Sequence, residues 1–210
     1  MNNRKLGYIF SLTYKKALTF HSDVNYGEYQ RFIDPDSYEM RYATKQEGQL
    51  SEQNVLLGGL AGFAFKTDYS KIKFTVLHLQ NGVNGAAQFQ LENDGEAVGQ
   101  SGYLAGSDNL YYNQRSLSNM FLGGTHLFAK SGWEIDWRAS PTFSTSDDPD
   151  IRRTAFTYRS RDTLFNAGAG GNPSRIWRFL DEINTTMKID ITKSLKLGGK
   201  DGKLKFGTSH

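Results

Sequence analysis

The chain of 210 residues contains no cysteine, which excludes disulfide-stapled scaffolds, thiolate metal sites and cysteine nucleophiles. Only four prolines are present, whereas 22 glycines occur both in expected turns and inside expected strands. No run of about 18 consecutive apolar residues occurs, so a membrane-spanning helix is not expected. The first residues lead directly into a strand pattern, and we expect no secretory signal there.

An excess of one charge is also missing. Lys and Arg number 25 against 22 Asp and Glu, and the signs are interleaved along the chain. A nucleic-acid platform would gather its basic residues on one face, so we expect no nucleic-acid partner. The sequence lacks G-x-S-x-G and H-E-x-x-H, and His21, His78, His126 and His210 form no pair at metal-ligand spacing. We therefore expect no enzymatic activity, no metal and no cofactor.

The most informative pattern that is present is a strict alternation of apolar and polar residues over 133–143. Because successive side chains of a strand face opposite sides, this segment has one apolar wall and one charged wall. A soluble sandwich turns the apolar wall inward, and an outer-membrane barrel turns it toward lipid. We expect Pro141, which cannot donate to a ladder, to mark a bulge or the end of the paired strand. The apolar wall comprises Trp133, Ile135, Trp137, Ala139, Pro141 and Phe143.

Similar patterns predict about seven strands whose connections alternate between short and long. Outer-membrane barrels join their strands in this way, with tight periplasmic turns and long extracellular loops, and a spanning strand needs about 9–11 residues. We predict an all-β fold: an antiparallel meander of about seven long strands that is part of a transmembrane β-barrel, with residues 1–210 as one partial barrel domain. The strands are expected near 5–19, 52–66, 71–80 (a continuation through 89 stays open), 109–128, 133–145, 182–197 and from 204 onward. The long connections are expected at 20–51, 81–108 and 146–181.

Five motifs occur in a fixed order: NQRSLSNM (113–120), GGTH (123–126), WEIDW (133–137), DDPDIRR (147–153) and KLKFG (203–207). In this order and spacing they resemble the middle of a TonB-dependent outer-membrane receptor barrel. The resemblance is to the Bacteroidetes type, which carries a carboxypeptidase-regulatory-like domain before its plug. Barrels of this kind have about 22 strands. Neither a plug domain nor a TonB box is recognisable, so we expect an internal fragment of the barrel.

The resemblance implies a nutrient transport receptor in the outer membrane of a Gram-negative bacterium. Such a receptor takes up an iron chelate, a vitamin or an oligosaccharide with energy from the TonB complex, which acts through the plug. The implied partners are the TonB complex, an extracellular small-molecule nutrient, outer-membrane lipid and lipopolysaccharide. The alternative is a soluble β-sandwich that binds a ligand or a carbohydrate, with its apolar walls packed together.

The expected loop 146–181 is basic and aromatic, and Arg and Trp are common binding anchors. We predict that it binds an anionic ligand such as a ferric chelate or an acidic sugar. The alternative is a loop that forms salt bridges with neighbouring loops or with lipopolysaccharide phosphates. The predicted ligand-binding residues are Arg152, Arg153, Arg175 and Trp177.

Two groups of carboxylates are explained without catalysis or metal binding. Asp147, Asp148 and Asp150 lack EF-hand spacing, and turn chemistry accounts for them. Glu134 and Asp136 share one strand face, where Arg138 and neighbouring lysines would neutralise them. We expect His126 to be a satisfied residue of the wall or of the lumen and not a ligand.

Overall fold

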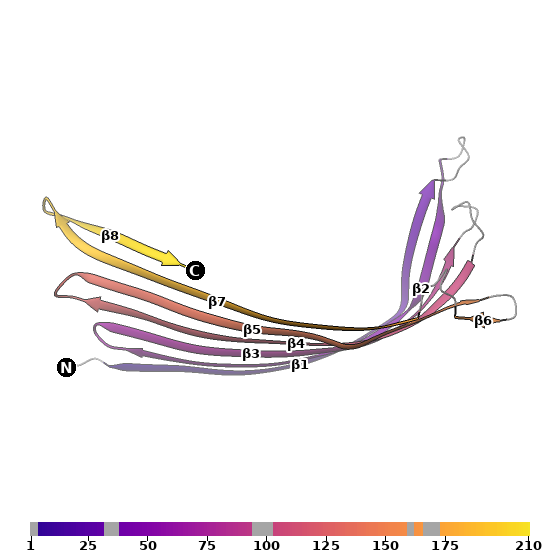
Figure 1. Ribbon diagram of the computed structural model, residues 1–210, viewed down its shortest axis with the longest axis horizontal. Coiled ribbons are helices and arrows are strands. Elements are labelled where there is room, and N and C mark those ends of the chain that lie inside the picture. Colours follow the sequence, from indigo (N-terminus) through magenta and orange to yellow (C-terminus); the bar gives the residue numbers. More distant parts are fainter. Residues whose placement is uncertain (1–3, 32–37, 94–102, 159–161, 166–172) are drawn as a thin grey trace.

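The computed structural model describes residues 4–31, 38–93, 103–158, 162–165 and 173–210. These residues form one antiparallel sheet of eight strands in the order β1-β2-β3-β4-β5-β7-β8, with the short β6 paired to β5 (Figure 1). The predicted all-β meander is confirmed. The strands are β1 (Lys5–Arg31), β2 (Met40–Lys66), β3 (Ser70–Asn93), β4 (Tyr103–Phe128), β5 (Trp133–Tyr158), β6 (Thr163–Leu164), β7 (Ser174–Leu197) and β8 (Lys200–Ser209).

Six of the strands are 24–27 residues long and run far beyond the predicted limits. The alternation of connections is confirmed, because residues 67–69, 129–132 and 198–199 form short turns at one end of the sheet, the turn end. The extent predicted for the long loops is wrong. Most of 20–51 and 146–181 belongs to strands, and only shorter segments remain between the strands at the opposite, loop end.

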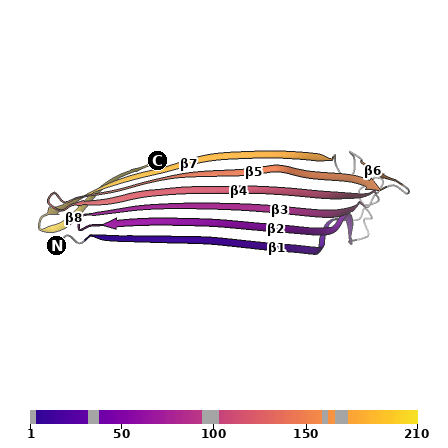
Figure 2. The ribbon, with the colours of Figure 1, turned by 90° about the horizontal axis from the view of Figure 1, so that it is seen from below.

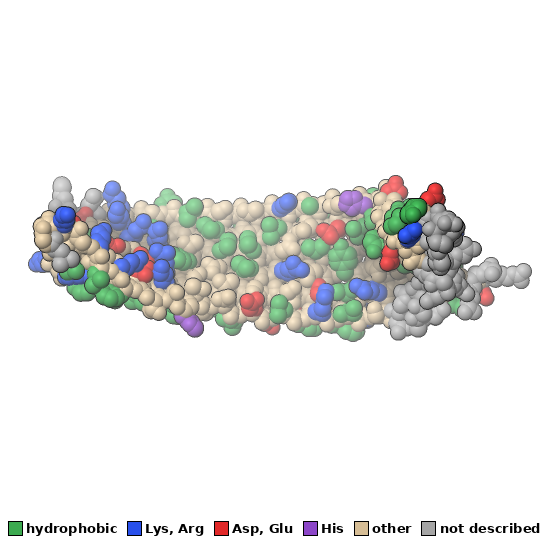
Figure 3. Space-filling view, turned by 90° about the horizontal axis from the view of Figure 1, so that it is seen from above, with side chains coloured by type: hydrophobic (Ala, Val, Ile, Leu, Met, Phe, Trp, Pro, Cys, Tyr) green, Lys and Arg blue, Asp and Glu red, His purple; other side chains and the backbone are tan. Residues whose placement is uncertain are grey.

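The sheet has two chemically different faces. It is curved, with its hollow side upward in Figure 1, and Figure 2 shows the long strands side by side in sequence order. The inner face is the hollow one, and Figure 3 shows Lys and Arg side chains gathered on it toward the turn end. The cross-strand register assigns Lys66, Lys71, Thr125, Arg138 and Lys188 to this inner face.

The outer face carries a continuous band of apolar side chains over the half of the sheet nearest the turns. On β1 the band runs over residues 6–14, on β2 over 57–65, on β4 over 120–128 and on β5 over 133–143. We call this the apolar band. Toward the loop end the same face is mixed, with polar side chains beside exposed apolar ones such as Leu18, Phe20 and Phe179. Exposed members of the band include Leu6, Phe10, Leu12, Phe63, Phe74, Leu122, Trp133, Ile189 and Phe206.

The sheet is a single layer and has almost no hydrophobic core. The buried apolar residues are four alanines, and no large side chain in the described part of the chain is fully buried. At the edges, β1 pairs with β2 alone and β8 with β7 alone among the described residues. The described segments contain no helix that could cross a bilayer.

Pro141 lies in the middle of β5, so the predicted end of the strand at this residue is wrong. It pairs with Thr185 of β7, and β5 continues to Tyr158. On the β4 side the ladder skips Met120 and Phe121, and the register is the same before and after the gap. Because proline has no N–H to donate, a local gap in the ladder replaces the expected bulge.

The β4–β5 turn depends on Gly132. This residue has φ of 68°, and the Ser131 and Gly132 N–H groups donate to the Phe128 carbonyl at 3.0 and 2.8 Å. The Gly132 carbonyl accepts from the N–H of Ser194 at 2.8 Å, which ties the turn to β7. The turn therefore needs a left-handed residue that also approaches the neighbouring strand closely.

Replacing Gly132 by alanine tests this turn. A Cβ there would lie 3.2 Å from the Ser194 carbonyl oxygen and would sit on a left-handed backbone, so Gly132→Ala should lower the free energy of unfolding by about 1–2 kcal/mol. The matched control is Gly59→Ala, where a Cβ meets nothing within 4 Å. Urea unfolding in detergent micelles measures both, and equal effects of the two substitutions would contradict the role of the turn.

Candidate ligand-binding site

A bulge in β5 decides which of its side chains reach the inner face. The register with β7 shifts between Asp148 and Ile151, so the inner face takes even-numbered residues before the bulge and odd-numbered residues after it. Asp148 and Arg153 therefore share the inner face. Asp150 and Arg152 lie on the outer face. Adjacent arginines of one strand thus point to opposite sides of the sheet.

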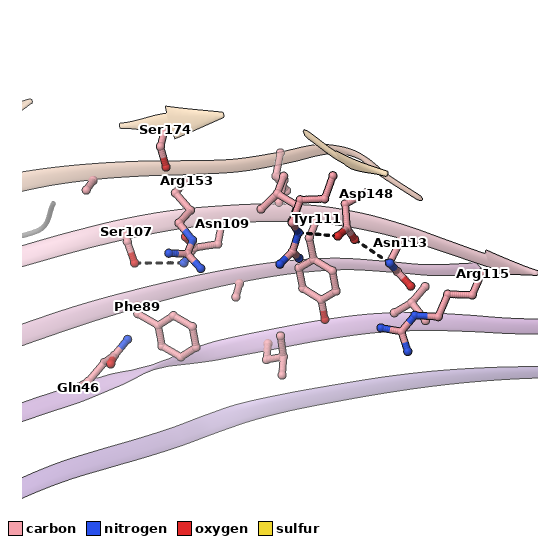
Figure 4. Close-up of a pocket in the computed structure, with 17 residues that line it drawn as sticks. Gln46, Phe89, Ser107, Asn109, Tyr111, Asn113, Arg115, Asp148, Arg153 and Ser174 are labelled. Atoms are coloured by element: carbon pink, nitrogen blue, oxygen red, sulfur yellow. Dashed lines mark hydrogen bonds and ion pairs between the residues drawn. The ribbon is translucent and has the colours of Figure 1, made fainter. Parts of the chain in front are cut away.

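On the inner face, at the loop-end half of the sheet, the side chains surround a cavity of about 900 Å³ (Figure 4). Its volume falls within the range of about 300–1,000 Å³ that is typical of small-molecule sites. Strands β2 to β5 and β7 all contribute to its lining. Its polar lining includes Asn109, Tyr111, Asn113, Arg115, Asp148 and Arg153.

The carboxylate in the cavity is already paired. Arg178 Nε donates to Asp148 Oδ2 at 2.7 Å, and Asn113 Nδ2 donates to Asp148 Oδ1 at 2.7 Å. The side chain of Asp148 is 12% exposed, and a buried carboxylate needs such partners. Arg115 and Arg153 also line the cavity, and within the described segments neither guanidinium has an ion-pair partner.

Tyr111 stands between these groups (Figure 4). Its hydroxyl donates to Glu52 Oε2 at 2.8 Å, across β3 to β2. Burial, followed by the hydrogen bond to the Glu52 carboxylate and its negative charge, raises the pKa of Tyr111 to about 12. The phenol therefore keeps its proton at neutral pH, and Glu52 is engaged with it. The ring lies over Gly85, where a Cβ would come within 2.1 Å of it.

The predicted site residues are not brought together. Arg153 lines the cavity, whereas Arg152, Arg175 and Trp177 lie on the outer face, where the two arginines hold Asp150. Arg175 binds Asp150 in a bidentate manner at 2.6 and 2.8 Å, and its guanidinium lies 5.3 Å from the centre of the Trp177 ring. The hydrogen bonds from Arg175 and then Arg152 hold the pKa of Asp150 well below its usual range.

The other carboxylates of the predicted turn diverge as well. Asp148 faces inward and Asp150 outward, so the bulge separates the groups that a single cation would have to join. No group of three His, Cys, Asp or Glu side chains in the described ranges could hold a metal ion. At the turn end, Asp136 accepts from Thr125 at 2.9 Å and pairs with Arg138 at 3.0 Å. This agrees with the expected neutralised network.

The sequence reasoning missed Tyr111 and did not single out Arg115 as a ligand-binding residue. The signal was an alternation of polar residues on β4, where Asn109, Tyr111, Asn113 and Arg115 occupy every second position. His126 is satisfied as expected, since Ser70 Oγ lies 3.0 Å from its Nδ1 and the ring stacks on Trp137. No protein-family model matches the chain, and no curated protein matches it either.

The pairing of Tyr111 with Glu52 is testable by titration. The difference in phenolate absorbance between the wild type and Tyr111→Phe should have its midpoint near pH 12. Because the folded chain holds this proton more tightly than the unfolded chain, the associated stabilisation is present below about pH 10 and is lost as the pH rises toward 12.

Replacement of the acceptor separates the causes of this shift. Glu52→Gln removes the negative charge and should lower the pKa of Tyr111, which should still exceed the ordinary value of 10.0 because burial, the largest cause, remains. A Tyr111 midpoint near pH 10 in the wild type would contradict the geometry of this pair.

Proposed function

We propose that the chain forms part of the wall of an outer-membrane β-barrel that belongs to a nutrient transport receptor. The observation that carries this proposal is the apolar band on the outer face. Its members are exposed although they are large and apolar, with Leu12 at 81% and Leu6 at 73%. Contiguous apolar surface of this kind marks a site of contact with lipid or with another protein.

The height and position of the band favour lipid. On β1, β2, β4 and β5 it covers 6–14, 57–65, 120–128 and 133–143, and a tilted membrane-spanning strand needs about 9–11 residues. On β2, β4 and β5 the band lies directly beside the short turns at residues 67–69 and 129–132, as one slab of hydrocarbon requires. Beyond it both faces mix polar and apolar side chains, which suits strands that continue above the membrane.

Aromatic and basic side chains border the band at the turn end. Phe128 and Trp133 face each other across the β4–β5 turn, and Lys193 Nζ lies 4.9 Å from the centre of the Trp133 ring. Aromatic girdles with nearby cations are typical of the membrane interface. On this proposal the turns are periplasmic and the loop end is extracellular.

The two edges of the sheet favour pairing with further strands. The edges offered by β1 and β8 have no partner in the described part of the chain, and an open edge is not tolerated in lipid. In the intact protein, further strands would therefore close the barrel. The five sequence motifs support a TonB-dependent receptor of about 22 strands, in which a plug would connect to the TonB complex. A nutrient would then reach the inner face from the loop end.

One pair of substitutions on β1 tests the membrane proposal. Leu12→Arg places a charge in the apolar band, and because Leu12 is 81% exposed the change removes little packing within the protein. In detergent micelles or lipid vesicles it should lower the free energy of unfolding by about 2–4 kcal/mol. The matched control, Ser11→Arg, lies on the inner face and should change the stability much less.

Two results would contradict the membrane proposal. A chain that is soluble, monomeric and cooperatively folded in detergent-free buffer would overturn the membrane proposal and favour a soluble binding module. Equal destabilisation by Leu12→Arg and Ser11→Arg in vesicles would contradict the assignment of the outer face to lipid.

A further inference from the structure

We propose that the inner-face cavity binds an elongated ligand that carries more than one negative charge and has an apolar or aromatic body. The inference rests on the proposed function for the direction from which the ligand arrives, and it deepens that function by choosing a substrate class. Its foundation is Arg115 and Arg153, two guanidiniums that line the same cavity and have no ion-pair partner among the described residues.

The two arginines lie on either side of Tyr111 (Figure 4). Arg153 is paired in register with Asn109 of β4, and Arg115 lies further along the same strand. Six residues of extended strand put the Cα atoms of Asn109 and Arg115 roughly 20 Å apart, and the long arginine side chains bridge part of that distance. Their separation suits a ligand with an acidic group at each end, since guanidinium binds carboxylate, sulfonate and phosphate in a bidentate manner.

The acidic side chains nearby do not compete for these arginines. Asp148 is held by Arg178 and Asn113, and Glu52 accepts from the Tyr111 hydroxyl. With Arg115, Arg153 and Arg178 against Asp148, the lining carries an excess of positive charge. A concave surface lined by charges of one sign focuses the electrostatic field and attracts ligands of the opposite charge.

Apolar side chains also line the cavity. Phe89, Val83, Ala87 and Leu50 contribute to its lining, and the Tyr111 ring lies over Gly85 beside them. The amides that a neutral sugar would need are partly engaged, because Asn109 donates to Ser107 Oγ at 3.2 Å and Asn113 donates to Asp148. The groups available to a ligand are therefore the guanidiniums of Arg115 and Arg153 and the apolar surface beside Tyr111.

The test measures binding of pyranine, a polycyclic aromatic trisulfonate, to the full chain in micelles of a neutral detergent by fluorescence anisotropy. Arg153→Gln and Arg115→Gln should each weaken binding at least about tenfold, because each removes a charge-assisted contact. The matched control is Arg152→Gln, one residue away on the opposite face, which should leave the affinity unchanged. Added salt should weaken binding, and the cationic dye proflavine should not compete.

Two results would overturn the proposal: equal weakening by Arg152→Gln and Arg153→Gln, or no rise in pyranine anisotropy with a chain that circular dichroism shows to be folded in micelles. The outcome is separable from that of the membrane proposal. If Leu12→Arg destabilises the chain in vesicles and pyranine does not bind, the membrane wall stands and the cavity proposal fails. If the chain folds and binds pyranine in detergent-free buffer, the reverse holds.

Discussion

The structure depends on one constraint, which is that a single-layer sheet has no second layer against which to bury its apolar face. The accessible surface of the chain is 15,295 Å². A compact monomer of this mass would expose about 9,800 Å². The excess belongs to both faces of the sheet and to its edges, and the apolar band is the part that water solvates poorly. The fold therefore requires an apolar environment on one side only, and this one-sidedness is what the proposed membrane wall satisfies.

The same alternation that creates the band also determines what reaches the inner face, and the bulge in β5 changes its phase once. Without the register shift between Asp148 and Ile151, Arg152 would point inward and Arg153 outward. The bulge thus places Asp148 and Arg153 together in the cavity. It leaves Asp150 to Arg152 and Arg175 on the outer face. One irregularity thus separates that ion cluster from the charged groups of the cavity.

Where one wall is apolar, the sequence was sufficient to predict the structure. Residues 133–143 alternate between an apolar and a polar wall, and the structure has them in one strand that follows the predicted turn. Beyond the band both walls carry polar and apolar residues, so the hydropathy loses its period of two and predicts loops there. Arg152 and Arg153 were grouped for the same reason, since proximity in sequence carries no information on face once a bulge intervenes. A bulge leaves no hydropathy signal in a segment that is polar on both sides.

Cohesion in this sheet comes from the backbone ladder more than from its charges. Several ion pairs join residues two apart on one strand face, such as Asp136 with Arg138 and Asp150 with Arg152, and these cannot hold strands together. Cross-strand pairs join β5, β7 and β8, where Asp148, Asp150 and Asp190 accept from arginine or lysine of the neighbouring strand. Because exposed ion pairs contribute little, they select register and leave stability to the ladder. The backbone hydrogen bonds of a sheet are complete only when its edge strands are paired. The side-chain hydrogen bonds on the inner face do not replace that pairing.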